Sequence, residues 1–420
     1  MKKFLILAIM CLFMTGSSFA DNFVKVSDGK FYRNDRQYTF YGANMWYASV
    51  LGSEGRGGDR KRLIEELDYL KSIGVDNIRL MAGAEGREGM FHKIEPSLQK
   101  APGVYNDTLL AGLDFVLAEM GKRDMVAVIY LNNSWEWSGG YGYYLEQTGH
   151  GEAPDPSKDY SAYVRHSAKF ATDEKAQKLF FDHVRFMVGR TNRYTGKAYS
   201  DDPAIMSWQV CNEPRAFAKA SIPGFKKWLA QTTELIRSID RNHLISLGSE
   251  GVYGCEVSAE VFRDVCADAN VDYCNIHIWP SNWGWASKKF PEQYVDMSMQ
   301  KTDEYIGWHL DICRELKKPL VIEEFGYPRD CASYSPESSV WARNRYDEYM
   351  FSVVRNSIEK GDIIQGCNFW AWGGLVHPQH EWWQRGDAFV GDPAQEPQGL
   401  FSVFASDKST IEIIKKYTIR

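Results

Sequence analysis

The sequence has 420 residues, of which 44% are hydrophobic, and a formal net charge of -6. A chain of this length can bury a large core, and α/β barrels commonly reach it as one domain. Acidic and basic residues are interspersed, which argues against a nucleic-acid partner and gives no sign of binding to a membrane surface. We therefore expect a globular protein whose ligand is uncharged.

Residues 1–20 have the pattern of a cleavable signal peptide. They start with two lysines, continue with an apolar core at 4–14 that is too short to cross a bilayer, and end in the small-x-small motif Ser18-Phe19-Ala20. We expect cleavage after Ala20. Residues 21–420 would then be one secreted or periplasmic domain, a monomer with no membrane insertion.

The cysteines do not indicate a metal site. Seven remain after the signal peptide, so at least one stays free in a compartment that permits disulfides, and their pairing is open. Cys211 lies in an expected core strand, where it would act as a small buried hydrophobe. Because no clustered metal ligands occur, we expect neither a metal nor a cofactor.

Apolar strands alternate with amphipathic helices along the chain. Such strands indicate a parallel sheet covered on both faces, and eight alternations predict an α/β fold of the (β/α)8, or TIM, barrel type. A small hairpin at 23–38 precedes the barrel. The expected strands are 38–45, 77–80, 125–131, 205–211, 244–247, 274–279, 320–324 and 366–372, and expected helices include one from Asp59 to Gly74, one ending at Gly121, one starting at 172–174, and 225–239. A long aromatic loop is expected at 132–169, a length that is usually functional.

Polar and aromatic residues fall where several of these strands end. The carboxyl ends of the strands in such a barrel form one rim, at which its sites lie. Asn212 and Glu213 follow one buried strand, and Glu323 and Glu324 end another. The residues expected at this rim are Arg79, Asn212, Glu213, His277, Trp279, Glu324 and Trp370.

Two carboxylates at one rim suit glycoside hydrolysis by double displacement, in which one attacks the anomeric carbon and the other is acid and then base. Arg79 next to Glu324 would keep that carboxylate ionised as the nucleophile. Apolar neighbours of Glu213 would raise its pKa, so that it can donate a proton. Asn212 is placed to bond the 2-hydroxyl of the sugar.

The aromatic residues support a sugar ligand, because an indole can lie flat against the apolar face of a pyranose ring. Trp370 is the expected platform beneath the reacting ring. Trp135 and Trp137 would extend a cleft along the sugar chain, and Trp382 and Trp383 would line its wall. Ordinary core packing is the alternative role for these indoles.

With these motifs, the chain resembles glycoside hydrolase family 5 and, within it, the endo-β-1,4-mannanases of subfamily 7. The resemblance rests on 131–140 (LNNSWEWSGG), 193–196 (RYTG), 202–205 (DPAI), 208–215 (WQVCNEPR), 248–251 (GSEG), 323–326 (EEFG), 368–374 (NFWAWGG) and 391–399 (GDPAQEPQG). It covers nearly all of 21–420 and implies a (β/α)8 catalytic domain.

The resemblance implies that Glu213 is the acid/base and Glu324 the nucleophile, with Glu323 as a neighbour. It places Arg215 on the leaving-group side of the cleft, and it maps supporting roles onto Arg79, Asn212, His277 and Trp370. One departure is Trp279, where the family commonly has tyrosine. An indole nitrogen cannot accept a hydrogen bond, so contact with the nucleophile requires its N–H to donate.

The expected activity is retaining endo-hydrolysis of mannan, galactomannan or glucomannan. Another family 5 β-glycanase, or an exo-acting β-mannosidase or mannobiohydrolase, remains an alternative, and the sequence leaves endo and exo action open. A non-catalytic glycan-binding protein is disfavoured, because both carboxylates and the supporting Arg79 and Asn212 are present.

Overall fold

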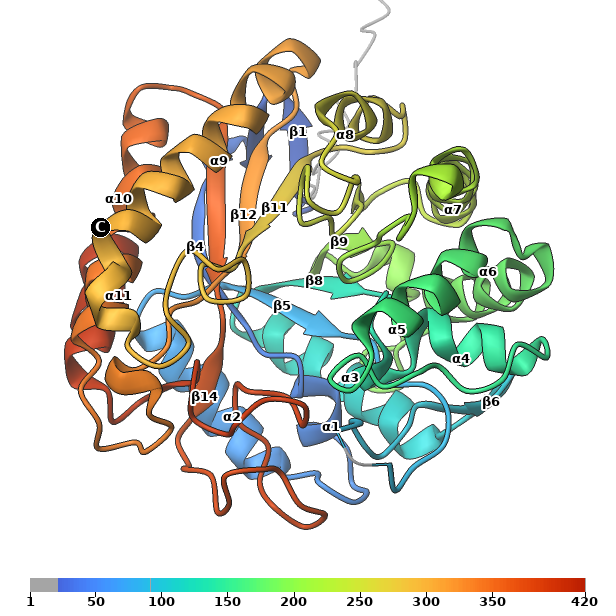
Figure 1. The fold of residues 1–420 in the computed structure, drawn as a ribbon, viewed down its shortest axis with the longest axis horizontal. Coiled ribbons are helices and arrows are strands. Elements are labelled where there is room, and N and C mark those ends of the chain that lie inside the picture. The colour runs from blue at the N-terminus through green and yellow to red at the C-terminus, as the bar shows by residue number, and fades with distance from the viewer. Residues whose placement is uncertain (1–21, 91, 420) are drawn as a thin grey trace, which may run out of the picture.

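The computed structural model of the chain describes residues 22–90 and 92–419, so the signal peptide expected at 1–20 lies outside the described residues. Eight parallel strands surrounded by helices form a barrel, which confirms the predicted fold (Figure 1). Each predicted strand is present within a few residues. In sheet order they are β10 (Leu244–Ser246), β9 (Ile205–Gln209), β8 (Val126–Tyr130), β5 (Asn77–Met81), β4 (Phe40–Asn44), β13 (Ile364–Phe369), β12 (Leu320–Phe325) and β11 (Cys274–Ile278).

The seam between β10 and β11 is closed by side chains as well as backbone. The Asp272 amide donates to the carbonyl of Ile245 at 2.8 Å, and its carboxylate accepts from the Ile245 amide at 2.7 Å. Higher up, the Asn275 side chain accepts from the Gly248 amide and donates to the carbonyl of Ser249. The sheet therefore surrounds its interior although regular strand pairing stops at this seam.

Helices cover the outside of the barrel, and several start at side-chain caps. Asp59, Asn106 and Asp173 each accept a hydrogen bond from an amide of the first helical turn, as expected of capping residues. Gly121 lies inside its helix, one residue before the end, so the predicted stop there was wrong by one residue. The helices are α1 (Ala48–Leu51), α2 (Arg60–Ser72), α3 (Asp107–Lys122), α6 (Glu174–Val188), α7 (Ile222–Ile239), α8 (Ala259–Cys266), α9 (Val295–Leu316), α10 (Trp341–Glu359) and α11 (Lys408–Thr418).

The segment 132–169 is not the structureless loop that the sequence predicted. It folds into α4 (Gly140–Gln147) and α5 (Tyr160–Ser167), because aromatic residues give these short helices a buried face. Tyr141 stacks on Phe170 with ring centroids 4.2 Å apart. A long connection at 375–402 has no regular structure, and two small ribbons, β6 (Gln99–Ala101) with β7 (Val104–Tyr105) and β14 (Trp372–Gly374) with β15 (Val403–Phe404), complete the loops.

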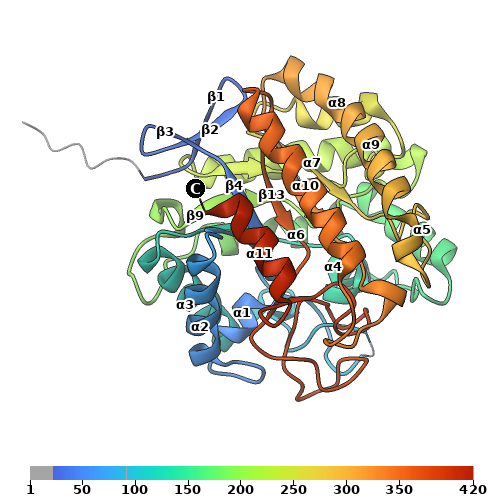
Figure 2. The same ribbon diagram turned by 90° about the vertical axis from the view of Figure 1, so that its left-hand side faces the viewer.

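The amino-terminal segment closes one end of the barrel. Instead of a two-stranded hairpin it forms three antiparallel strands, β1 (Lys25–Ser27), β2 (Lys30–Arg33) and β3 (Arg36–Tyr38). Figure 2 shows them at the opposite end from the long connection. Phe31 is fully buried and meets the ring of Tyr273 edge-on, with centroids 5.4 Å apart.

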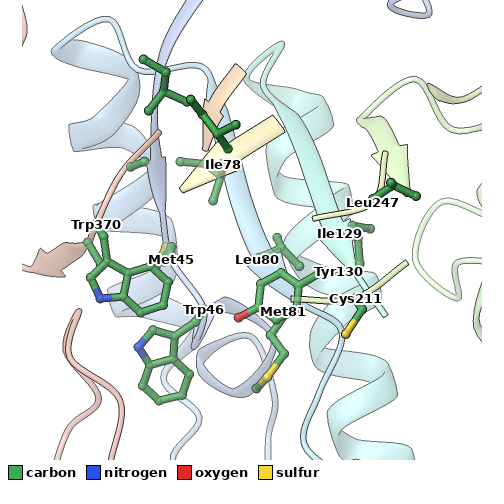
Figure 3. Packing of buried hydrophobic residues seen from close by; sticks show 14 of the residues in the cluster. Met45, Trp46, Ile78, Leu80, Met81, Ile129, Tyr130, Cys211, Leu247 and Trp370 are labelled. Carbon is green, nitrogen blue, oxygen red and sulfur yellow. The ribbon is translucent and has the colours of Figure 1, made fainter. Parts of the chain in front are cut away.

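Alternation along the strands separates the core into two parts. Ile78 and Leu80 pack in the cluster between sheet and helices (Figure 3), whereas Arg79 between them points into the barrel. The lower barrel interior is apolar and includes Phe31, Phe40, Val128, Met206 and Val321. The polar site thus stands on an apolar base. Across the described residues, no helix combines the length and the apolar character that crossing a membrane requires.

Candidate active site

Glu324 stands near the carboxyl end of β12 and is held by three neighbours. Arg79 donates to its Oε1 at 2.5 Å, and the indole N–H of Trp279 donates to its Oε2 at 3.2 Å. His277 Nδ1 lies 3.3 Å from the same Oε2. Trp279 therefore reaches the predicted nucleophile by donating, which is the one contact that an indole can make in place of a phenol.

Arg79 organises the floor of the site. Its guanidinium donates to Asn44 at 3.1 Å, to Asn212 at 2.9 Å and to Gln209 at 2.8 Å, in addition to Glu324. The side chain is fully buried and lies over the ring of Tyr130, 4.5 Å from its centroid. Because four strands contribute these contacts, the orientation of Glu324 is fixed by the barrel itself.

Glu213 follows β9 on a backbone with φ of 51°, a conformation that non-glycine residues rarely adopt and that is often found at functional sites. Its amide donates to the carbonyl of Gly248, and its own carbonyl accepts from the hydroxyl of Ser134. These bonds hold the turn that aims the carboxyl group inward. Its Oε2 accepts from the indole of Trp135 at 2.5 Å, and its Oε1 lies 2.9 Å from His277 Nδ1.

The two carboxyl groups face one another across a short gap. One carboxyl oxygen of Glu213, one of Glu324 and a ring nitrogen of His277 all lie within 4.8 Å of one another. This limit on the nearest oxygens is in keeping with the ~5–5.5 Å between the carboxyl groups of retaining enzymes and shorter than the ~6.5–9.5 Å that inverting enzymes need. The same trio could also hold a metal ion, which the sequence did not lead us to expect. A cation there would occupy both carboxyls and so oppose this chemistry.

Burial raises the pKa of both carboxyls, and the pair titrates as a unit because each repels the charge of the other. The prediction that Glu324 is ionised while Glu213 is protonated therefore depends on their direct partners. Glu324 bonds the guanidinium of Arg79, whereas Glu213 bonds the neutral indole of Trp135. Burial lowers the pKa of His277 well below its usual range, so this ring is neutral and adds no positive charge. Arg215 also lowers the pKa of Glu213, but it acts through space and is paired with Glu250, whereas Arg79 bonds Glu324 directly. We therefore expect the single charge of the pair on Glu324.

A cavity of about 670 Å³ opens above the two carboxyls. Eight of the ten residues predicted for the site line it, while Arg79 and His277 lie beneath its surface and support it. Trp382 and Trp383 do not line it, so their predicted place in the wall was wrong. Trp383 instead stacks on Phe389, with centroids 5.1 Å apart, and Trp382 meets His92 edge-on. The predicted residues that line the cavity are Trp135, Trp137, Asn212, Glu213, Arg215, Trp279, Glu324 and Trp370.

On the side beyond Glu213, the wall contains residues that the sequence did not assign. Arg215 forms an ion pair with Glu250 and lies over the indole of Trp135, 5.2 Å from its centroid. Tyr253 and Trp283 continue this wall, with ring centroids 4.6 Å apart. Glu250 lies in the motif 248–251 that carried part of the resemblance, so it could have been noticed. The contact of Tyr253 with Trp283 joins two separate loops and could not.

On the side beyond Glu324, the long connection 375–402 supplies Gln395 and Glu396. Oε1 of Gln395 and Oε2 of Glu396 are buried and have no hydrogen-bond partner among the described residues. Burial and the nearby carboxyls raise the pKa of Glu396 well above its usual range. Unpaired polar groups in a cavity are suited to bind the hydroxyls of a sugar.

Comparisons with known proteins show which families and structures this chain is similar to. Residues 21–420 match a family described as GH family 5 beta-mannosidase-like. Mannan endo-1,4-beta-mannosidase 1 of Arabidopsis thaliana is 28% identical over 83% of this chain and 81% of its own. A glycoside hydrolase family 5 mannosidase of Rhizomucor miehei, solved with mannosyl-fructose, has a TM-score of 0.86 at 31% identity and covers 95% of this chain and 97% of its own. An endo-1,4-beta-mannanase of the same fungus shares the fold, with a TM-score of 0.70 at 21% identity and coverage of 94% and 98%.

Proposed function

The chain belongs to glycoside hydrolase family 5, in its β-mannosidase-like group, and on this premise we propose that it hydrolyses β-1,4-mannosidic bonds of mannan, galactomannan or glucomannan with retention of configuration. The observation that carries the proposal is the pair Glu213 and Glu324, whose oxygens approach within 4.8 Å at the floor of one cavity. The relatives named as mannan endo-1,4-beta-mannosidases support mannan as the substrate.

In the first step, the carboxylate of Glu324 attacks the anomeric carbon while Glu213 gives its proton to the departing oxygen. A glycosyl ester on Glu324 results. In the second step, Glu213 takes a proton from water, which attacks the same carbon and releases Glu324. Trp279 and Arg79 hold Glu324 in position, and Asn212, oriented by its bond to Arg79, faces the cavity where the 2-hydroxyl would lie.

In the first form of this proposal, the enzyme cleaves bonds inside the polysaccharide. The relatives named as mannan endo-1,4-beta-mannosidases support this form. A second form, release of sugar from a chain end, is favoured by the shape of the cavity. Beyond Glu324 it is lined by Gln395 and Glu396, and its lining includes none of the described residues before Trp135. On the side of Glu213, the lining includes Arg215, Tyr253 and Trp283, which would face the departing sugar.

Product analysis separates these forms. Internal attack on galactomannan lowers viscosity before much reducing sugar appears and yields mixed short manno-oligosaccharides. Chain-end attack releases mannose or mannobiose alone from the first minutes with little loss of viscosity. Carboxymethyl cellulose is the control, and cleavage of it at a comparable rate would contradict mannan specificity. Proton NMR of the first product should show the β anomer, and an α anomer would contradict retention.

We also propose that the chain is exported, on the basis of the signal-peptide pattern at residues 1–20, and that it acts as a monomer. Amino-terminal sequencing of the protein from the producing cell should begin at Asp21. An intact amino terminus on the active protein would contradict export by this route, and light scattering would test the monomer.

A further inference from the structure

A second cavity, of about 830 Å³, lies where the helices α10 and α11 begin. Figure 2 shows these helices side by side. The helices of a (β/α)8 barrel follow the carboxyl ends of its strands, so this cavity lies toward the same end of the barrel as the catalytic cavity. Its lining includes Trp341 and Asn344 of α10, Ser409 of α11, and His377 of the long connection 375–402.

Trp341 presents a large apolar ring at this cavity. It is the first residue of α10 and is 52% exposed. Asp330 accepts hydrogen bonds from the amides of Trp341 at 3.3 Å and Ala342 at 3.0 Å, which fixes the start of the helix. The guanidinium of Arg345 lies over the indole, 5.1 Å from the ring centroid, and is paired with Asp296 at 2.7 Å. The indole is thus held in place while it stays open to solvent.

Polar groups of fixed position share the cavity with the indole. The side-chain amide of Asn344 donates to Oγ of Ser409 at 2.8 Å, and its carbonyl oxygen accepts from the hydroxyl of Thr410 at 2.7 Å. The Ser409 hydroxyl has no acceptor among the described residues, so it can donate to a ligand. Nε2 of His377 lies 2.9 Å from Oγ of Ser406. Such donors and acceptors suit the hydroxyls of a sugar.

The charged residues of the lining do not favour an ionic ligand. Asp407 is buried and pairs with Arg329 at 2.7 Å. Nζ of Lys408 donates to the carbonyl of Ala405 at 2.8 Å, and Glu337 has the opposite charge to Lys408. An exposed indole beside hydroxyl, amide and imidazole groups, without an excess of one charge, is suited to an uncharged ligand with many hydroxyls.

We propose that this cavity is a second binding site for the mannan backbone, separate from the catalytic cavity. The identity of the polysaccharide rests on the proposed function. One pyranose ring would lie on the open part of the Trp341 indole, with its hydroxyls bonded to Ser409 and His377. Because the connection 375–402 borders both cavities, a polysaccharide long enough to span them would bind at both. Binding at one site then makes binding at the other intramolecular, which raises the affinity for long chains alone.

Binding without hydrolysis gives the first test. Glu324→Ala and the double variant Glu324→Ala, Trp341→Ala are run in native gels that contain galactomannan or no polysaccharide. Galactomannan should retard the single variant more strongly, with an apparent Kd about 5-fold lower than that of the double variant. Trp308→Ala in the same Glu324→Ala background is the control, because Trp308 is an indole of similar exposure, 49%, that lines neither cavity. It should not change the retardation.

Kinetics of the active chain give the second test. Trp341→Ala should raise KM for galactomannan by about 5-fold, and KM for mannotetraose by less than about twofold, since a short substrate fills only the catalytic cavity. Trp341→Phe keeps a flat apolar ring and should restore most of the affinity. Trp341→Gln replaces the ring by a polar helix former and should repeat the losses of Trp341→Ala, so the test does not depend on the folding of one variant.

The outcomes separate this proposal from the proposed function. Retardation by galactomannan that does not depend on Trp341 would overturn the second site, as would a KM that rises equally for galactomannan and mannotetraose. Hydrolysis of galactomannan with an unchanged KM in Trp341→Ala would overturn the second site and leave the proposed function intact. Retardation that depends on Trp341 in a chain that does not cleave mannan would support the second site and contradict the proposed function.

Discussion

The floor of the cavity differs from its walls. Every side chain of the floor is buried and bonded to a residue from another strand of the barrel. The floor consists of Arg79, Asn212, Glu213, His277 and Glu324. The walls come from connections between strands and helices, and their side chains are partly exposed. They consist of Trp135, Tyr253, Trp283 and Glu396. The floor can thus hold charges in a fixed arrangement, while the walls offer surfaces to the substrate. Changes in the floor should act on the chemical step, and changes in the walls on binding.

The largest effects are expected at the two carboxyls. Glu324→Ala should lower kcat by about 10⁴-fold or more and Glu213→Ala by about 10²–10⁴-fold, because each removes a group that takes part in bond breaking. With an activated aryl β-mannoside, azide should restore turnover of Glu213→Ala and give a β-azide product. Glu323→Ala is the control. An inactive Glu323→Ala beside an active Glu324→Ala would contradict the assignment of the nucleophile.

Arg79 tests whether the floor acts through charge. Arg79→Gln should lower kcat by about 10²–10³-fold, as loss of a preorganised donor does. Arg79 lowers the pKa of Glu324, so its removal should raise that pKa and move the acidic limb of the kcat/KM profile to higher pH. Arg190→Gln, which removes an arginine that pairs with Asp114 of α3 and does not line the cavity, should change stability alone. An acidic limb that does not move in Arg79→Gln would show that Arg79 only supports the fold.

Trp135 belongs to the wall but bonds a floor residue, so it tests the boundary between them. Trp135→Phe should lower kcat by about 10-fold, the value of one hydrogen bond of about 1.4 kcal/mol. The indole N–H lowers the pKa of Glu213, and its loss should move the basic limb to higher pH. Trp137→Phe is matched to it, since Trp137 lines the cavity without bonding Glu213. A pure KM effect in Trp135→Phe would place it wholly in the wall.

Trp283 tests the wall alone. Trp283→Ala should raise KM for mannotetraose by about 5-fold and leave kcat within about twofold, since the ring touches no reacting group. Trp308→Ala is the control, because it belongs to the same aromatic cluster but does not line the cavity. A fall in kcat by a factor as large as the rise in KM would mean that this wall also positions the reacting ring.

Glu85 should give the smallest effect, on stability. It anchors α4, which follows the wall residue Trp135. Its carboxyl accepts hydrogen bonds from the Gly140 amide at 2.9 Å and the Tyr144 hydroxyl at 2.6 Å, and burial raises its pKa to about 8. Between about pH 4.3, where the unfolded chain ionises, and pH 8, the folded chain binds the extra proton, so its stability falls as pH rises. Glu85→Gln should remove this slope. Between pH 5 and pH 8, the Tm of the variant should therefore rise by a few degrees relative to the Tm of the parent. Glu146→Gln should not.

The floor could be predicted because its residues obey the geometry of strands. Glu213 and Glu324 follow apolar runs, and alternation places Arg79 opposite the outward Ile78 and Leu80. A parallel barrel then brings these strand ends to one rim, so that spacing along the chain was enough. The pKa difference within the pair was harder, because it depends on which carboxyl bonds which donor.

The walls could not be predicted in the same way, because loops meet through tertiary contacts that leave no periodic pattern. Trp382 and Trp383 were expected in the wall on aromatic content alone, yet they pack on His92 and Phe389. Glu396 reaches the cavity only because the connection 375–402 folds back beside Trp370. The helices α4 and α5 were missed because each has only eight residues, too few for a periodic apolar face to stand out in the sequence.

The strands β1 to β3 close the far end of the barrel and keep water away from the charged residues above it. Phe31 seals this end against Tyr273, whose hydroxyl bonds Glu323 and Ser207 beneath the guanidinium of Arg79. Water admitted there would screen the field of Arg79 from below and weaken its effect on the carboxyl above. A surface ribbon with no access to the substrate therefore helps to set the dielectric in which the bond is broken.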